Sequence, residues 1–177
     1  MDWGVLKGKM IRAARLESGL YREVEADDGA NQEAFAVVAL ASLAQGVSLA
    51  NAGLFGEAGG LKGFVIGVLG GVTSWLFWAL IIYLIGVRLL KHRSDMNVLL
   101  RCLGFASAPG VLKVFALIPG IAIPLQFGIA VWMLATFIVA VRQALGVDTR
   151  RAVLVSALGF LLYLAIFLLL MSMGVAI

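Results

Sequence analysis

Long apolar runs separated by short polar segments constrain this chain more than any other feature. Hydrophobic residues make up 62% of its 177 residues and charged residues only 14%, whereas a soluble domain would carry about 25% charged residues. A helix needs about 20 apolar residues to cross a bilayer, and a bilayer leaves no water for unpaired backbone groups. The sequence therefore predicts an all-α polytopic membrane helix bundle. Its five predicted transmembrane helices cover about residues 34–55, 63–87, 102–118, 121–141 and 152–177.

Residues 1–33 precede this membrane domain (34–177) and form a polar segment. Apolar side chains recur in it at spacings of three and four, which predicts an amphipathic helix; they are Leu6, Met10, Ala13, Leu16, Leu20 and Val24. Such a helix can lie in the lipid headgroup layer with its apolar face down, or it can pack on the cytoplasmic face of the protein itself. The sequence does not decide between these two placements.

The basic residues are distributed as topology signals. Segments 1–33, 88–101 and 142–151 hold five, four and three of the fourteen Lys and Arg residues, while the opposite side shows only Lys62. The positive-inside rule then predicts a cytoplasmic N-terminus and an external C-terminus. Because the cations lie between apolar runs, nucleic-acid binding is not expected.

Two predicted spans carry residues suited to helix packing. The first span is the most polar, and its polar side chains are expected to turn inward because lipid-facing polar groups are costly; they are Ser42, Gln45, Ser48 and Asn51. The second span repeats Gly63, Gly67 and Gly71 at every fourth position. Such a face lets two helix backbones approach closely, either within the molecule or between two copies.

The stretch from Arg101 to Leu125 departs most from a regular apolar helix. It contains all three prolines (Pro109, Pro119 and Pro124) and Lys113, a cation inside a hydrophobic run. A kink is predicted at Pro109, because proline removes a backbone donor. An intramembrane cation suggests a functional site, with freed carbonyls, Gln45, Asn51 or a substrate anion as its partner. The alternative is that Lys113 extends to the outer headgroups.

Four segments resemble bacterial members of the Yip1-domain family: LYREVEADDGANQEAFAVV (20–38), YLIGVRLL (83–90), RCLGFASAPGVLKVFALIP (101–119) and VWMLATFIVAVRQAL (131–145). The resemblance implies a five-helix protein of the bacterial inner membrane with a cytoplasmic N-terminal segment. Eukaryotic relatives are associated with Rab-type small GTPases and vesicle traffic. The N-terminal region of this chain is much shorter than theirs, so a small GTPase is not expected as its partner.

An acidic cluster matching the family's Tyr-x-Glu-Val-Glu-x-Asp pattern lies just before the first span. Its members are Tyr21, Glu23, Glu25 and Asp27. On one helix Glu23 and Asp27 share a face, as two ligands of a cation would. The favoured interpretation is that the cluster neutralises the basic segments 88–101 and 142–151, with the N-terminal segment folded back onto them.

These features favour a non-enzymatic membrane scaffold or adaptor that packs against lipids, other membrane proteins or a second copy of itself. A small oligomeric channel or transporter with Lys113 in its path is the competing class, and an accessory subunit of a larger membrane complex is the third. The sequence contains no nucleophile–base pair, phosphate-binding loop or metal-ligand cluster. Neither catalysis nor a cofactor or metal ion is therefore expected.

Overall fold

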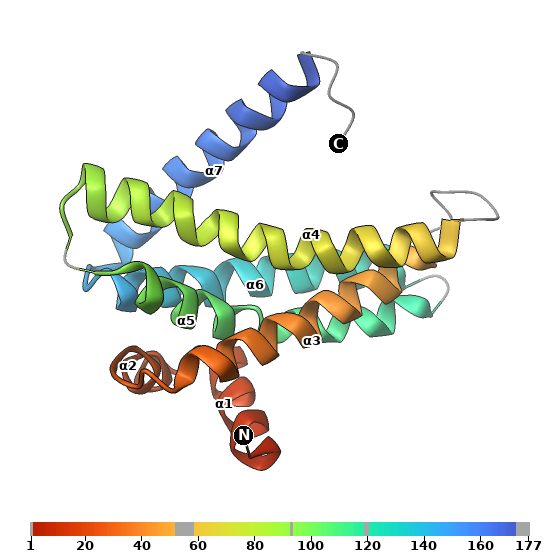
Figure 1. The fold of residues 1–177 in the computed structure, drawn as a ribbon, viewed down its shortest axis with the longest axis horizontal. Helices are drawn as coiled ribbons and strands as arrows, with labels where there is room; N and C mark the ends of the chain where they lie inside the picture. Colours follow the sequence, from red (N-terminus) through yellow and green to blue (C-terminus); the bar gives the residue numbers. More distant parts are fainter. Residues whose placement is uncertain (1, 52–58, 93, 119–120, 173–177) are drawn as a thin grey trace.

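All regular secondary structure is helical in the residues that the computed structural model describes, which are 2–51, 59–92, 94–118 and 121–172, without the side chains of 163, 164 and 166–172. The elements in order are α1 (Trp3–Ala14), α2 (Ser18–Ala26), α3 (Ala30–Ala50), α4 (Gly59–Ile82), the π-helix η1 (Tyr83–Leu89), α5 (Met96–Ala106), the 3-10 helix η2 (Ala108–Leu117), α6 (Ala122–Ala144) and α7 (Thr149–Ser172). Helices α3, α4, α6 and the α5–η2 pair run side by side along the long axis of the molecule (Figure 1).

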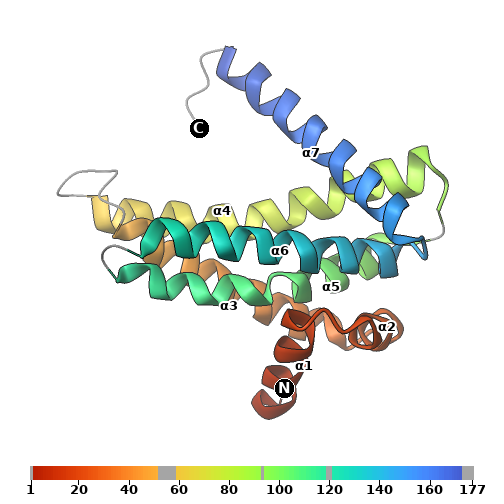
Figure 2. The same ribbon diagram turned by 180° about the vertical axis from the view of Figure 1, so that it is seen from behind.

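Four stretches of the described residues are long and apolar enough to cross a membrane: Ala30–Ala50, Gly60–Leu89, Met96–Leu117 and Ala122–Ala144. The fifth predicted span is covered by α7 up to Ser172, and its last residues, 173–177, lie outside the described part. Viewed from behind, α7 leaves one end of the bundle and runs away from α4 (Figure 2). A five-span topology therefore remains a prediction.

The prediction of a single N-terminal amphipathic helix is wrong, because the chain turns between α1 and α2 at Leu16. The N–H groups of Leu16 and Glu17 bond back to the carbonyls of Ala13 and Arg12 at 3.0 and 3.1 Å. This pattern ends a helix with one residue in the left-handed conformation, a position usually held by glycine. Leu16 adopts it with φ of 63°. Sequence periodicity missed this break because no glycine or proline marks it.

The apolar side chains of α1 and α2 are buried against the bundle. Leu6, Leu20 and Val24 are at most 1% exposed and belong to one core with residues of α5 and α6. The indole Nε1 of Trp132 in α6 also donates to the carbonyl of Ala14 at 2.7 Å. Of the two placements open at the sequence level, the structure therefore has the helices packed on the protein itself.

The third span begins earlier than predicted, at Met96 rather than near residue 102. Asp95 precedes α5, and its carboxylate accepts from the Val98 N–H at 3.1 Å. This side-chain cap stabilises a helix start that the apolar pattern does not show. Similarly, the first span begins at Ala30 instead of residue 34, which brings Glu33 into α3, where it pairs with Lys9. The predicted end of that span, residues 52–55, lies outside the described residues.

Candidate functional site: a cavity between five helical elements

Close contact between α3 and α4 forms one wall of the site. The glycines of the predicted small-residue face point at α3 of the same chain. An added Cβ at Gly67 would lie 2.6 Å from Gly46 Cα, and one at Gly63 would lie 2.8 Å from the Leu49 carbonyl oxygen. At Gly71 it would collide with Ser42. In this arrangement, the three glycines allow the backbones of α3 and α4 to touch within the molecule.

The change from α- to 3-10 helix at Pro109 forms the opposite wall. Proline brings no N–H to this turn, and the Gly110 N–H bonds the Ser107 carbonyl three residues back at 2.8 Å. The carbonyl of Ala106 accepts from the hydroxyl of Thr136 in α6 at 2.8 Å, and Thr136 is fully buried. A neighbouring helix thus satisfies a backbone group at the break, as membrane interiors require.

The 3-10 geometry decides where Lys113 lies. With three residues per turn, Ser107, Gly110 and Lys113 fall on one face of the chain, and all three line the same cavity. In an ideal α-helix, Lys113 would be rotated well away from Ser107 because 3.6 residues complete a turn. The predicted kink at Pro109 is therefore a change of helix type, and that change directs Lys113 inward.

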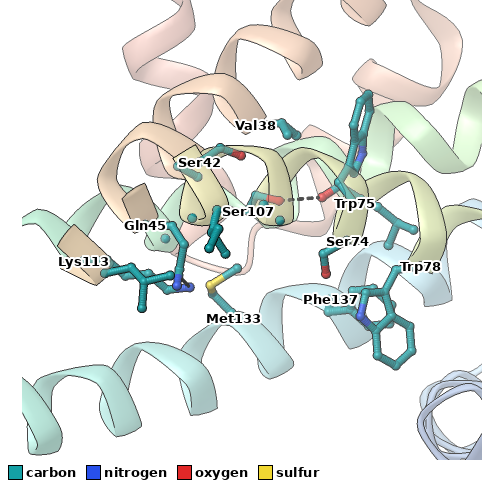
Figure 3. A pocket seen from close by; sticks show the side chains of 18 residues that line it. Val38, Ser42, Gln45, Ser74, Trp75, Trp78, Ser107, Lys113, Met133 and Phe137 are labelled. Carbon is teal, nitrogen blue, oxygen red and sulfur yellow. Dashed lines mark hydrogen bonds between the residues drawn. The ribbon is translucent and has the colours of Figure 1, made fainter. Parts of the chain in front are cut away.

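The cavity has a volume of about 520 Å³ and is lined by α3, α4, α5, η2 and α6. Figure 3 shows its two contrasting ends. Lys113, Gln45 and Met133 gather at one end, whereas Trp75, Trp78 and Phe137 gather at the other. The rings of Trp78 and Phe137 meet edge to face with centroids 5.3 Å apart. The site is thus polar at one end and aromatic at the other.

Gln45 supplies the observed partner of Lys113, whose Nζ donates to Gln45 Oε1 at 2.5 Å. Of the partners weighed from the sequence, Asn51 instead donates to the carbonyl of Val47 in its own helix. No acidic side chain pairs with Lys113 among the described residues, and none lines this cavity. Ser42 and Ser48 of the same polar span are buried, as expected of inward-facing groups.

The acidic cluster does not come together as a cation site. Both Glu23 oxygens accept from the Arg12 guanidinium at 2.7 Å, and these bonds hold the pKa of Glu23 below its usual value while raising that of Arg12. Glu25 accepts from Gln143 at 3.4 Å. The carboxylate of Asp27 accepts from the Gly29 N–H at 2.9 Å. Each acid therefore serves a separate structural contact.

Tyr21, the remaining member of that cluster, is fully buried against α5, and burial raises the pKa of its phenol above the usual range. Its hydroxyl has no hydrogen-bond partner among the described residues. Tyr21 lies on α2 and is not among the residues that line the cavity, so it belongs to a different part of the molecule.

Arg101 is the residue that sequence reasoning placed wrongly, because it was counted among the cations of a cytoplasmic loop. It lies within α5, is 3% exposed, and donates at 2.7 Å to the Asp27 carbonyl and to the Asp28 carboxylate. The N-terminal segment does fold back onto segment 88–101, but Asp28 makes the ion pair. Asp95 is the sequence feature that could have revealed this, because a helix that starts after an Asp95 cap already includes Arg101.

No group of His, Cys, Asp or Glu side chains within the described residues could hold a metal ion. Several long apolar helices packed through glycines and buried hydroxyls instead define an integral membrane protein with multiple spans. The Yip1 domain family model matches residues 20–171. Since this match covers most of the chain, the protein belongs to the Yip1 domain family. Neither the curated proteins nor the solved structures contain a match.

Proposed function

We propose that this Yip1 domain protein is a non-enzymatic membrane scaffold or adaptor that binds other membrane proteins, lipids or a second copy through its helix surfaces. The path of α7 carries the proposal. Among the α7 residues whose side chains the structure describes, Gly159 is the last buried one, and it packs against Trp78 and Ile81 of α4. Phe160 and Leu161, which follow it, are more than half exposed. The backbone of the helix then runs away from the bundle (Figures 1 and 2), which leaves the exposed residues Phe160 and Leu161 able to contact a partner helix.

The proposed topology has five spans, with the N-terminus in the cytoplasm and the C-terminus outside the inner membrane. Contacts between segments 1–33, 88–101 and 142–151 support it, because Arg101 reaches Asp28 and Gln143 reaches Glu25 at one end of the bundle. Twelve of the fourteen cations belong to these three segments, as the positive-inside rule requires of a cytoplasmic side. Cysteine accessibility in intact cells tests it: a cysteine near Met1 should be shielded and one appended after Ile177 should react.

Photo-cross-linking in native membranes tests the scaffold. A photoreactive amino acid replaces Leu161, which is exposed on α7, and the matched control replaces Val155, which is buried against the bundle. We expect a discrete adduct from position 161 that mass spectrometry identifies as a specific membrane protein or a second copy. Adducts of unselected bulk lipid alone from position 161, together with a monomeric mass and no co-purifying lipid in mild detergent, would overturn the scaffold proposal.

A small anion channel or transporter is the second candidate function, and the position of Lys113 in the cavity supports it. Its cationic group lacks an acidic partner among the described residues and lines a space of about 520 Å³. Anion efflux from liposomes containing the wild type, the Lys113→Met variant or the Lys113→Arg variant tests this role. Flux that the Met variant loses and the Arg variant keeps would support transport, whereas wild-type liposomes without flux would exclude it.

A further inference from the structure

We propose that the cavity is a lateral binding site for one long-chain carboxylate, such as a fatty-acid anion. The acid group would lie at Lys113 and Gln45, and the alkyl chain would lie against Gly70 and Trp78. This site does not depend on the scaffold role, because it concerns a ligand taken from the bilayer and not a protein partner.

The walls of the cavity favour entry from the side of the bundle. Helix α3 packs against both α4 and η2, and η2 packs against α6, but α4 and α6 are not packed along one another. They approach through the ring contact between Trp78 and Phe137, which closes the aromatic end. Gly70 and Ser74 of α4 line the cavity and are exposed. The opening between α4 and α6 therefore faces the lipid that surrounds a membrane bundle.

Charge selects the head group of the ligand. A lysine ammonium has three N–H donors, and Gln45 accepts one of them. A cation in a membrane interior without an acid to pair with is costly, and the described residues that line this cavity include no Asp or Glu. A carboxylate would provide the missing counter-charge and accept a charge-assisted hydrogen bond from Nζ.

The distribution of apolar groups selects a chain attached to that acid. Beyond the polar end, the cavity is lined by glycines of α4 and by the rings of Trp75, Trp78 and Phe137 (Figure 3). Binding sites of about 300–1,000 Å³ that combine an apolar wall with a few convergent polar groups are typical of small-molecule ligands. Lys113 lies four residues before the end of η2 at Leu117, so roughly 8 Å of 3-10 helix separates it from that end. An acid at the end of a single chain reaches this depth more readily than the headgroup of a two-chain phospholipid.

Tryptophan fluorescence provides the assay, because two of the four tryptophans line the cavity. Replacing Trp3 and Trp132 by Phe leaves Trp75 and Trp78 as reporters. The full chain in mild detergent is titrated with 9,10-dibromostearate, whose bromines quench indoles on contact, and with its uncharged methyl ester as a matched probe. We expect saturable quenching by the acid and binding at least about tenfold weaker for the ester, as for the loss of one charge-assisted hydrogen bond.

Three substitutions locate the binding site. Lys113→Met should weaken acid binding about tenfold or more, and Lys113→Arg should retain most of it. Gly70→Leu should abolish saturable quenching by filling the cavity, and it should leave the fold intact because an added Cβ at Gly70 meets nothing within 4 Å. Gly128→Leu is the matched control: Gly128 is equally open, but lies on α6 outside the cavity.

The proposal fails if the acid and the ester quench alike, or if Gly70→Leu and Gly128→Leu bind the acid equally, since both results indicate non-specific contact with the protein surface. An absence of quenching in the reporter protein would also overturn the proposal, because it would show that another group, such as α7 or a second copy, fills the cavity. Tighter binding of dibromostearoyl phosphatidylglycerol than of dibromostearate would refute the single-chain carboxylate.

Discussion

The close approach of α3 and α4 at Gly67 leads to the sharpest prediction, because the contact atoms all belong to backbone. In the Gly67→Ala variant, the new Cβ would lie 2.6 Å from Gly46 Cα, 2.9 Å from Gly46 N and 3.0 Å from the Gln45 carbonyl oxygen. Carbon atoms pack best at about 3.5–4.0 Å, so the two helices must separate by roughly 1 Å. Neither a side-chain rotation nor a flexible end can absorb this shift.

The size of the expected destabilisation follows from the packing contacts that such a shift loosens. A gap of 0.5–1 Å forfeits about a quarter to a half of each dispersion contact, and overpacked cores typically lose about 1–3 kcal/mol. We expect Gly67→Ala to lower the free energy of unfolding by that amount. Gly70→Ala, three residues along the same helix, should change it by less than about 0.5 kcal/mol because its Cβ enters open space.

Unfolding by sodium dodecyl sulfate in mixed micelles, followed by far-ultraviolet circular dichroism, measures both variants against the wild type. The mass of each protein in mild detergent is measured in parallel, because the same glycines could instead form a dimer seam. Equal unfolding midpoints for Gly67→Ala and Gly70→Ala would refute the intramolecular contact. A wild-type dimer that Gly67→Ala converts to a monomer without loss of stability would assign the glycines to an interface between copies.

Three further predictions concern the end of the bundle on which α1 and α2 pack. Gly146 has φ of +61° after α6, so Gly146→Ala should lower the free energy of unfolding by about 1 kcal/mol in the same denaturation assay; an unchanged midpoint would contradict the left-handed turn. Arg101→Ala should lower the free energy of unfolding by about 2 kcal/mol, because Arg101 is buried and its removal leaves a void. Arg101→Met, which fills that void, should restore most of this loss. Equal losses in the two variants would show that the hydrogen bonds of Arg101 contribute more than its packing. The bonds from Arg12 lower the folded-state pKa of Glu23, so their contribution is present above the unfolded pKa of roughly 4.3 and is lost as pH falls through the folded value. Below about pH 4.3, the thermal midpoint of the wild type should therefore fall more steeply than that of Glu23→Gln, and parallel curves would contradict this coupling.

Much of the membrane architecture could be predicted from local composition. Apolar runs of sufficient length indicate membrane helices wherever they occur, because backbone groups in a bilayer must bond within the helix. The close glycine approach on α4 was also readable from its spacing, although the choice between α3 and a second chain was not. The ends of the helices were harder to predict from the sequence, since Leu16 occupies a turn that usually needs glycine and Asp95 caps α5 outside the apolar run.

The candidate site shows most clearly which features the sequence determines and which depend on the tertiary structure. The sequence by itself determined that Lys113 is a cation in an apolar run and that Pro109 interrupts the regular helix before it. Only the tertiary structure decided that the interruption is a 3-10 segment, which aligns Lys113 with Ser107, and that Gln45 lies opposite. The reason is physical: local composition sets which backbone bonds can form near a proline, but the choice among helix types depends on packing and on distant groups such as Thr136, which bonds the carbonyl at the break.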